Sequence, residues 1–282
     1  MLPEPISSLQ NPRVKEAARL RERRQRARRG LFLIDGAREL GRALEAGIEI
    51  VEVFVCPERC ATPQCRQLTA RLAECGLPLV SVTPAVFAKL AYGERAEGLV
   101  GVARTPTRSL ADLRLPAEPL VAVLEGIEKP GNVGAIVRSA DAAGVSAVIV
   151  VDGGTDLYNP NAIRASMGTI FAVAVVAASK DELLDWIARE RLAIVAARPD
   201  AATPYTAVDF RRPTAIVVGS EHAGLSAWWT RSAGAARAEQ CVTSVRLPMC
   251  GAADSLNVSV TAAVLFYEAL RQRGSHDTRS GG

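Results

Sequence analysis

The stretch CVTSVRLPMCGAADSLNVSVTAAVLFYEALRQR, residues 241–273, decides the fold of this chain. It opens with an apolar run typical of a strand, passes through a Gly/Ala-rich turn and closes in a long helix. Asp254 or Ser255 can cap that helix, because either side-chain oxygen can accept a hydrogen bond from an unpaired backbone N–H. Polar side chains between a strand end and a helix start are typical of ligand sites in open α/β sheets. The alternative is an ordinary last βα unit whose Ser and Asn only cap.

The same alternation extends back to residue 120. Apolar runs rich in Val, Ala and Ile predict six strands, at residues 120–127, 146–152, 171–177, 192–197, 214–220 and 241–247. Helical patterns lie between most of them, at residues 133–143, 159–167, 180–191 and 225–233. Near-continuous apolar strands separated by helices predict an α/β fold with a parallel sheet buried on both faces.

The N-terminal part predicts a second, smaller α/β domain. Asn11 and Pro12 begin a helix that we expect to continue through the arginines to Gly30. Strands and helices then alternate as far as Arg104, and a proline-rich linker follows. The predicted organisation is a basic helix (1–30), a small domain (31–104), a linker (105–119), the parallel-sheet domain (120–273) and a flexible tail (274–282).

Basic residues are concentrated near the N-terminus. The net charge of the chain is +4, yet residues 11–30 hold nine Lys or Arg against two acids, Glu16 and Glu22. Such a run favours a phosphate-rich partner, because each neutralised phosphate releases condensed counterions. The alternative is a solvated surface helix. We expect nucleic acid to be contacted by Arg23, Arg24, Arg26 and Arg28.

The composition disfavours several classes of protein. The 282 residues suggest about two domains, and 49% hydrophobic with 23% charged residues are typical of a globular chain. The N-terminus lacks the apolar core of a signal peptide, and no stretch approaches the roughly 20 apolar residues of a membrane helix. We therefore expect a cytoplasmic location and no membrane partner.

The six cysteines do not have the spacing of a metal site. Four of them crowd residues 56–75, without the tight Cys pair or His partner that zinc requires. We expect free thiols and no metal.

Common cofactor and hydrolase motifs are missing from the sequence. It contains no G-x-G-x-x-G after a first strand, no G-x-x-x-x-G-K-[ST] and no G-x-S-x-G. The two histidines, His222 and His276, offer little for a Ser/His/Asp triad. Hydrolysis and nicotinamide-dependent redox chemistry are therefore disfavoured.

Three polar clusters follow strands of the predicted parallel sheet. They are EKPGNVGAIVR at residues 128–138, VGSEHAG at 218–224 and LPMCGAADSLNVS at 247–259. Asn132 can cap the helix that carries Arg138, and Gly219 lets a ligand approach the backbone. All three clusters lie at the carboxyl ends of strands, as a single site requires. The alternatives are a surface salt bridge for Arg138 and core packing for the leucines.

These patterns resemble the three motifs of the TrmH/SpoU family. They are N-x-G-x-x-x-R at 132–138, V-G-S-E-x-x-G at 218–224 and L-P-M-x-G…S-L-N-V-S-V at 247–260. The family belongs to the SPOUT superfamily of S-adenosylmethionine-dependent RNA 2′-O-ribose methyltransferases. The first domain resembles the L30e/L7Ae-like substrate-binding domain. The layout is similar to rRNA methyltransferases of antibiotic producers, such as the avilamycin- and thiostrepton-resistance enzymes.

The resemblance implies a SPOUT α/β-knot domain, with a deep trefoil knot in the sheet, and a homodimer. It implies S-adenosyl-L-methionine as the cofactor, bound by Ala197, Gly219, Leu247, Met249 and Leu256. It assigns catalysis, without a metal, to Arg138, Asn132, Glu221, Ser255 and Asn257. Arg138 is expected to bind a phosphate and stabilise charge rather than act as a base, because a guanidinium stays protonated.

Other functions remain open at this point. One is a non-catalytic RNA-binding factor with the same fold, and another is a base methyltransferase of the same superfamily, which the ribose-type motifs disfavour. The two-domain layout favours 23S rRNA over tRNA as the target. Antibiotic resistance is a biological role that the resemblance suggests.

Overall fold

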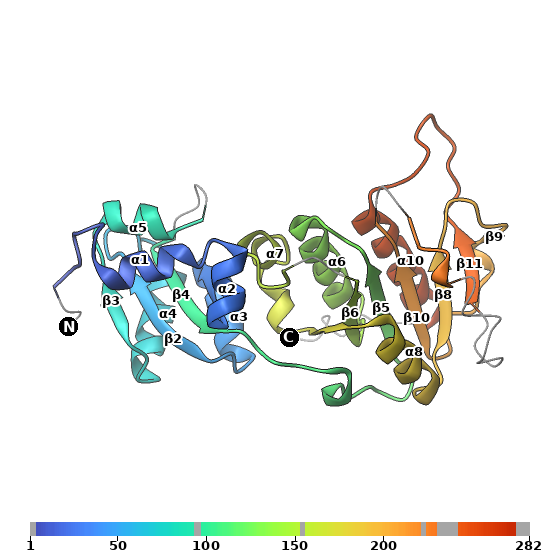
Figure 1. Ribbon diagram of the computed structural model, residues 1–282, viewed down its shortest axis with the longest axis horizontal. Helices are drawn as coiled ribbons and strands as arrows, with labels where there is room; N and C mark the ends of the chain where they lie inside the picture. Colours follow the sequence, from blue (N-terminus) through green and yellow to red (C-terminus); the bar gives the residue numbers. More distant parts are fainter. Residues whose placement is uncertain (1–3, 93–96, 153–155, 221–223, 230–241, 275–282) are drawn as a thin grey trace. The chain divides into compact units, whose positions relative to one another are not determined.

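A computed structural model describes residues 4–92, 97–152, 156–220, 224–229 and 242–274 (Figure 1). Contacts between Cα atoms divide the chain into two compact units. The first unit comprises residues 1–107 and 156–172, and the second comprises residues 108–155 and 173–282. The predicted boundaries place residues 156–172 in the parallel-sheet domain, whereas these contacts group them with the N-terminal part.

The first unit is built on a four-stranded mixed sheet. The strand order is β1-β4-β2-β3, with β4 antiparallel to β1 and β2, and β2 parallel to β3. Its elements are α1 (Pro12–Arg19), α2 (Arg23–Arg29), β1 (Leu31–Asp35), α3 (Ala37–Glu45), β2 (Ile50–Val55), α4 (Pro63–Glu74), β3 (Leu79–Ser81), α5 (Pro84–Leu90), β4 (Leu99–Arg104), α7 (Pro160–Ala165) and η2 (Thr169–Phe171).

The N-terminal helix is interrupted, so the expectation of one continuous helix is wrong. Asn11 caps α1 as predicted, its side chain accepting from the Arg13 backbone N–H at 2.9 Å. The helix ends at Arg19, and the C-cap residue Leu20 is buried in the core. The Leu20 carbonyl accepts a hydrogen bond from the Arg26 guanidinium at 2.6 Å. A side chain from α2 therefore takes the place of the backbone donor that would have continued the helix.

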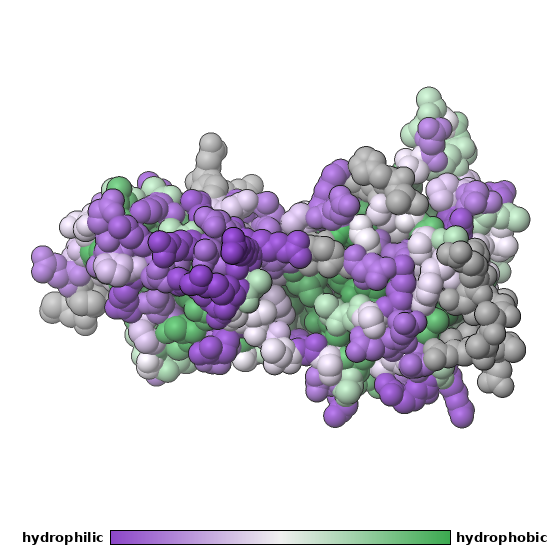
Figure 2. Space-filling view, in the orientation of Figure 1, coloured by the Kyte–Doolittle hydropathy of each residue, from purple (hydrophilic) through white to green (hydrophobic). Residues whose placement is uncertain are grey.

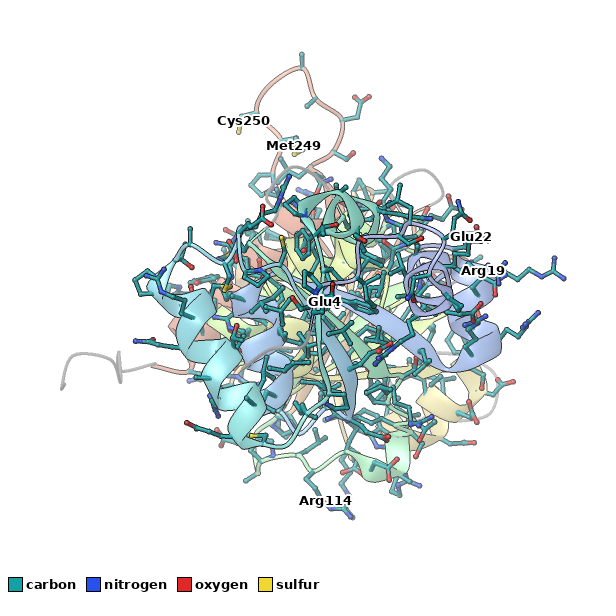
Figure 3. All side chains as sticks on the ribbon, turned by 90° about the vertical axis from the view of Figure 1, so that its left-hand side faces the viewer. Glu4, Arg19, Glu22, Arg114, Met249 and Cys250 are labelled. Carbon is teal, nitrogen blue, oxygen red and sulfur yellow. A yellow bond between two sulfur atoms is a disulfide. The ribbon has the colours of Figure 1, made fainter. Side chains whose placement is uncertain are left out.

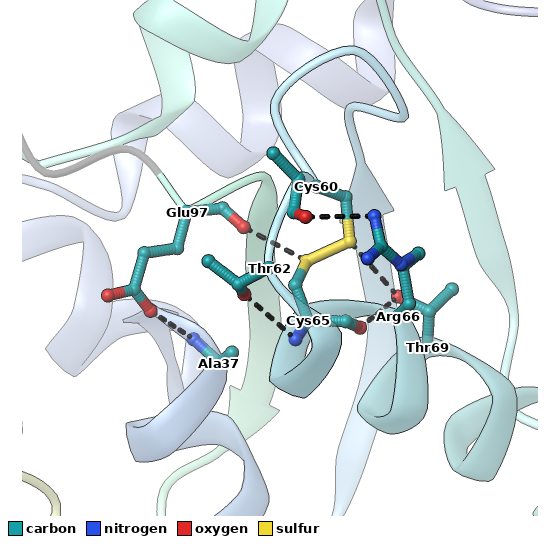
Figure 4. Close-up of a disulfide and its surroundings, with 8 residues drawn as sticks. Ala37, Cys60, Thr62, Cys65, Arg66, Thr69 and Glu97 are labelled. Atoms are coloured by element: carbon teal, nitrogen blue, oxygen red, sulfur yellow. Dashed lines mark hydrogen bonds between the residues drawn. A yellow bond between two sulfur atoms is a disulfide. The ribbon is translucent and has the colours of Figure 1, made fainter.

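A disulfide corrects the expectation that all cysteines are free thiols. Cys60 and Cys65 are bonded, with their Cα atoms 5.5 Å apart, at the start of α4 (Figure 4). Thr62 caps that helix, its hydroxyl accepting from the Cys65 backbone N–H at 3.1 Å. The cap turns the chain so that the two sulfurs meet. Cys56, Cys75 and Cys250 are free among the described cysteines.

The second unit confirms the predicted α/β fold with a parallel sheet. The order of the seven strands is β7-β6-β5-β10-β8-β11-β9, and every pair is parallel. Its elements are η1 (Leu110–Asp112), β5 (Leu120–Glu125), α6 (Pro130–Ala142), β6 (Ala147–Val151), β7 (Ala174–Ala178), α8 (Lys180–Arg189), β8 (Ala193–Ala197), β9 (Thr203–Pro204), η3 (Tyr205–Ala207), β10 (Thr214–Val218), β11 (Val242–Arg246) and α10 (Val258–Gln272). The strand β9 was not predicted, because its two residues are too short to show a periodic pattern.

The sheet is buried on both faces, as its apolar runs predict. On one face, Val123 and Val217 are paired in register and pack with Leu183 and Trp186 of α8. Alternate residues such as Leu124 and Val218 point to the other face and are equally buried. Helices α6 and α10 contact each other and, respectively, β6 and β10.

The predicted knot stays a prediction, because residues 230–241, which precede β11 in the sequence, lie outside the described residues. None of the described helices is long and apolar enough to cross a membrane.

Candidate functional site

A pocket of about 300 Å³ lies in the second unit, at the carboxyl ends of β8, β10 and β11 and the start of α10. This is the edge where open parallel sheets hold their ligands. Its lining combines backbone at the strand ends with apolar and polar side chains. The lining residues are Ala197, Arg198, Pro199, Val218, Gly219, Ser220, Gly224, Val245, Leu247, Met249, Asp254, Ser255, Leu256, Val258 and Thr261.

The five residues expected to bind a cofactor all line this pocket. They come from the end of β8 and from the segments that follow β10 and β11, and are Ala197, Gly219, Leu247, Met249 and Leu256. Met249 and its neighbour Cys250 lie on a loop that extends away from the ribbon (Figure 3). The structure thus brings together residues up to 59 positions apart in the sequence, from 197 to 256.

Gly219 lies where no larger residue fits. A Cβ atom at this position would collide with the carbonyl group of Gly224 and would come within 2.6 Å of the Leu225 backbone nitrogen. The Gly224 N–H donates to the Ser220 carbonyl at 3.0 Å, so these two residues are held beside each other. The sequence predicts that a ligand approaches the backbone at Gly219, and the structure shows that the chain's own backbone at Gly224 and Leu225 also packs closely there. Gly219, Ser220 and Gly224 form one wall of the pocket.

Two of the expected catalytic residues meet at the start of α10. The Asn257 amide nitrogen lies 3.4 Å from the Asn132 side-chain oxygen. Asn257 also caps α10, its side-chain oxygen accepting from the Ser259 backbone N–H at 2.9 Å. The predicted caps Asp254 and Ser255 are wrong, because the helix begins only at Val258, and both residues line the pocket instead. Asn132 does not cap α6 either, since that helix already begins at Pro130.

Arg138 is exposed on α6, six residues beyond Asn132. It has no hydrogen-bond or ion-pair partner among the residues that the structure describes, which leaves the guanidinium available to a ligand. Within that part of the chain, it forms no hydrogen bond with Asn132 or Asn257. Glu221 lies outside the described residues.

Some lining residues were missed by the sequence reasoning. Arg198 and Pro199 directly follow β8, and Thr261 lies one turn into α10. The Arg198 backbone N–H donates to the Val245 carbonyl at 2.8 Å, so the strand pairing of β8 and β11 continues into the pocket rim. Only their position in the sequence could have indicated that these residues line the pocket, since each lies next to a predicted strand end or helix start.

The basic N-terminal segment forms a strongly hydrophilic surface over α1 and α2 (Figure 2). Arg23, Arg24 and Arg28 are exposed and make no hydrogen bond or ion pair with other residues of the described ranges. Arg26 contradicts the expectation that it contacts nucleic acid. Its side chain is 4% exposed and is occupied by Asp156, by the Leu20 carbonyl and by the Arg21 carbonyl. Arg26 therefore stabilises the fold of the first unit through these contacts.

Among the described residues, no group of three or more His, Cys, Asp or Glu side chains could hold a metal ion.

Comparison with family models adds two matches. Residues 119–267 match the model of the SpoU rRNA Methylase family. Residues 11–101 match the MRM3-like substrate binding domain.

Individual relatives match most of the chain. A 23S rRNA (uridine(2479)-2′-O)-methyltransferase of Streptomyces viridochromogenes is 32% identical over 93% of this chain and 90% of its own length. A crystal structure of an RNA 2′-O ribose methyltransferase is 47% identical with a TM-score of 0.82, covering 96% of this chain and 99% of that one. The SpoU methyltransferase AviRb from Streptomyces viridochromogenes, in complex with the cofactor AdoMet, is 29% identical with a TM-score of 0.84, covering 94% and 98%.

Proposed function

Since this chain belongs to the SpoU rRNA methylase family, we propose that it transfers a methyl group from S-adenosyl-L-methionine to a ribose 2′-oxygen of 23S rRNA. The observation that carries this proposal is the pocket at the strand ends, with the Asn132–Asn257 pair at the start of the same helix α10. Relatives that match nearly the whole chain are named as enzymes of this kind.

The pocket fits S-adenosyl-L-methionine in size and chemistry. A volume of about 300 Å³ is at the lower end of the range for small-molecule sites, which are mostly apolar with a few polar groups. Leu247 and Leu256 offer apolar walls for an adenine ring, and backbone groups beside Gly219 offer hydrogen bonds. When bound, the sulfonium supplies an activated methyl group, and the chain itself must align the ribose with it.

Arg138 supplies charge stabilisation in this proposal. Its guanidinium stays protonated, so it binds the neighbouring RNA phosphate and stabilises negative charge that develops on the 2′-oxygen. The proton leaves to a phosphate oxygen or to water. Asn132, Ser255 and Asn257 orient the ribose through hydrogen bonds, and the expected role of Glu221, which lies outside the described residues, stays a prediction.

The test is to map 2′-O-methylated nucleotides in rRNA and tRNA from cells with and without the gene. We expect one 23S rRNA position to lose its methyl group in the deletion strain and regain it on complementation. If a tRNA nucleotide loses its methyl group instead, the substrate is tRNA and the assignment to 23S rRNA is wrong. Unchanged methylation in both RNAs, with cofactor still bound by the purified protein, would favour a non-catalytic RNA-binding factor.

We also propose a homodimer formed through α10. Val260 and Tyr267 lie on one stripe of that helix, seven residues apart, and are 47% and 51% exposed. A second copy would bury this stripe beside the pocket, because Val258 and Thr261 of the same helix line it. Sedimentation analysis should give twice the chain mass, and Tyr267→Asp should shift it towards the monomer. A monomeric parent protein would refute the proposal.

The proposed substrate places the enzyme in the cytoplasm, where ribosomal RNA is found. A role in antibiotic resistance is tested by comparing the growth of the deletion and complemented strains with ribosome-targeting antibiotics. Equal sensitivity would remove that role while leaving the methylation assignment intact.

A further inference from the structure

A buried carboxylate at the end of β5 is bonded to the loop that follows β10. Glu125 is the last residue of β5 and is 5% exposed. One of its oxygens, Oε2, accepts the Ser226 backbone N–H at 2.9 Å, and the other, Oε1, accepts the Ser226 hydroxyl at 2.6 Å. A single carboxylate therefore fixes both polar groups of Ser226.

Lys180 completes this cluster from the start of α8. Its Nζ lies 2.6 Å from Glu125 Oε1, and it also pairs with Asp152, just after β6. The same ammonium group lies 5.5 Å from the centre of the Trp228 ring. Burial raises the pKa of Glu125, but the hydrogen bonds from Lys180 and Ser226 outweigh it and keep that pKa below its usual value. The carboxylate is thus charged at neutral pH and accepts from all its partners.

The loop held by Glu125 is a wall of the cofactor pocket. Val218, Gly219, Ser220 and Gly224 all line the pocket, and Ser226 follows two residues later. The turn at Gly219 is too tightly folded to admit a Cβ atom. The position of such a loop depends on how its two ends are held. One end is β10, and the other is Ser226.

The same carboxylate lies where the segment with the expected catalytic residues begins. Gly126 follows it with φ +62°, and a Cβ atom there would lie 3.8 Å from the Ser220 Cβ. Helix α6, which carries Asn132 and Arg138, starts at Pro130. The chain leaving β5 and the loop after β10 therefore pass side by side directly beyond Glu125.

We propose that Glu125, held by Lys180, is a positioning residue that fixes the pocket wall after β10 against the segment leading to Asn132 and Arg138. The inference rests on the proposed function, because the wall matters only if the pocket takes S-adenosyl-L-methionine. Glu125 is buried and does not line the pocket. It acts through Ser226, and small displacements of aligned groups are enough to slow a transfer reaction.

The main test is Glu125→Gln. Glutamine keeps the shape of the side chain but removes its charge, so the Ser226 hydroxyl loses the carboxylate oxygen that accepts from it and Lys180 loses its charged partner. Because hydrogen bonds to a charged group are stronger than those between neutral groups, we expect the Kd for S-adenosyl-L-methionine to rise about tenfold or more. Titration calorimetry measures the Kd, and turnover at saturating cofactor on 23S rRNA should also fall. An unchanged Kd in folded protein would overturn the inference.

A matched control is Glu182→Gln in the same helix. Glu182 accepts from the Ser179 backbone N–H at 2.9 Å and from its hydroxyl at 2.7 Å, which caps α8 without touching the loop after β10. This control should lower the Tm but leave the Kd within about twofold, because a cap contributes only to helix stability. An equal loss of cofactor affinity in the control would reduce Glu125 to a merely structural role and overturn the proposal.

Ser226→Ala and Ser226→Thr make the inference independent of whether Glu125→Gln folds. Alanine removes the hydroxyl, which donates to Glu125 and accepts from Lys180 at 3.3 Å, but keeps the backbone N–H bond to Glu125. We therefore expect the Kd to rise roughly threefold, whereas threonine keeps the hydroxyl and should restore it. A Kd unchanged in Ser226→Ala would refute the role of Glu125. Failure of the parent protein to bind S-adenosyl-L-methionine would instead refute the proposed function itself.

Discussion

Arg26 of α2 and Asp156, which is 130 residues further along the chain, form an ion pair with Nη2 and Oδ2 2.5 Å apart. The arginine side chain is 4% exposed and the aspartate 16%. The pair joins the basic N-terminal segment to residues 156–172 within the first unit. Phe32 of β1 reinforces this junction, because its ring lies 4.7 Å from that of Tyr158 and 6.0 Å from that of Phe171.

Arg26→Ala should therefore destabilise the protein by about 3 kcal/mol or more, since it leaves Asp156 as a largely buried charge without its partner. The measurement is the free energy of unfolding in urea. Arg24→Ala is the matched control, because Arg24 lies on the same helix, is exposed and has no partner in the described part of the chain. It should change stability by less than about 0.5 kcal/mol. Equal effects of the two substitutions would contradict the assignment of Arg26 to the fold.

The exposed arginines of α2, which we expect to contribute little to stability, should contribute to RNA affinity. Replacing Arg23, Arg24 and Arg28 with Gln removes three exposed charges, so the slope of log K against log salt should become shallower by up to about 3. Filter binding or fluorescence anisotropy over a series of salt concentrations measures that slope with an rRNA fragment. An unaltered slope would show that this surface does not contact phosphate, and the unfolding free energy of the triple variant serves as the control.

The ionisation of Asp35 should make the stability of the protein depend on pH. Burial, with smaller contributions from Glu39 and Glu97, raises the pKa of Asp35 from 3.8 to about 6, against the opposing hydrogen bond from the Tyr92 backbone N–H and the charge of Arg164. Its Oδ1 is buried without a partner among the described residues. Between these two pKa values the folded state binds more protons than the unfolded state. The contribution of this group to stability therefore falls as the pH rises from about 4 to 6.

Asp35→Asn removes this ionisation, so it should stabilise the protein by roughly 3 kcal/mol at pH 8 and by almost nothing below pH 4. Urea unfolding at several pH values measures the difference. Asp112→Asn provides a control of opposite sign, because hydrogen bonds from Ser109 lower the pKa of this exposed carboxyl. That variant should lose stability above pH 4 and match the parent protein in acid. A pH-independent effect of Asp35→Asn would contradict the raised pKa.

The sequence predicts the parallel sheet well because local pattern determines it. Runs such as residues 120–124 and 215–218 are apolar without interruption, and only burial on both faces accommodates them. The pocket residues were also predictable, since each motif directly follows a strand and the strand ends meet at one edge. The identity of the cofactor was predicted from the resemblance to the TrmH/SpoU motifs, because hydrophobic periodicity alone does not indicate a cofactor.

What could not be predicted depends on partners that are distant in sequence. Arg26 belongs to a uniform run of arginines, and nothing local separates it from Arg24 until Asp156 is placed beside it. Glu125 likewise reads as the polar end of a strand, because Lys180 and Ser226 lie 55 and 101 residues away. The shift of the α10 cap to Asn257 has a similar origin, since the residues before it line the pocket instead of joining the helix.

Arg138→Ala should abolish most methyl transfer while preserving the fold and cofactor binding. Arg138 is exposed on α6, has no partner among the described residues and does not line the pocket, so its removal disturbs neither packing nor the cofactor. Loss of one charge-stabilising group typically lowers kcat by about 10²–10³-fold. Single-turnover methylation of 23S rRNA measures the loss, and calorimetry should return the parent Kd for S-adenosyl-L-methionine.

Arg138→Lys distinguishes positioned charge from charge alone. Lysine keeps the positive charge but lacks the planar fork that can bind two oxygens at once. If Arg138 bridges a phosphate and the developing 2′-oxyanion, lysine should recover only part of the activity, and the rate should not follow the titration of a basic group between pH 7 and 9. Full activity in Arg138→Lys would mean that a point charge suffices. Full activity in Arg138→Ala would move the catalytic role to another residue of the site.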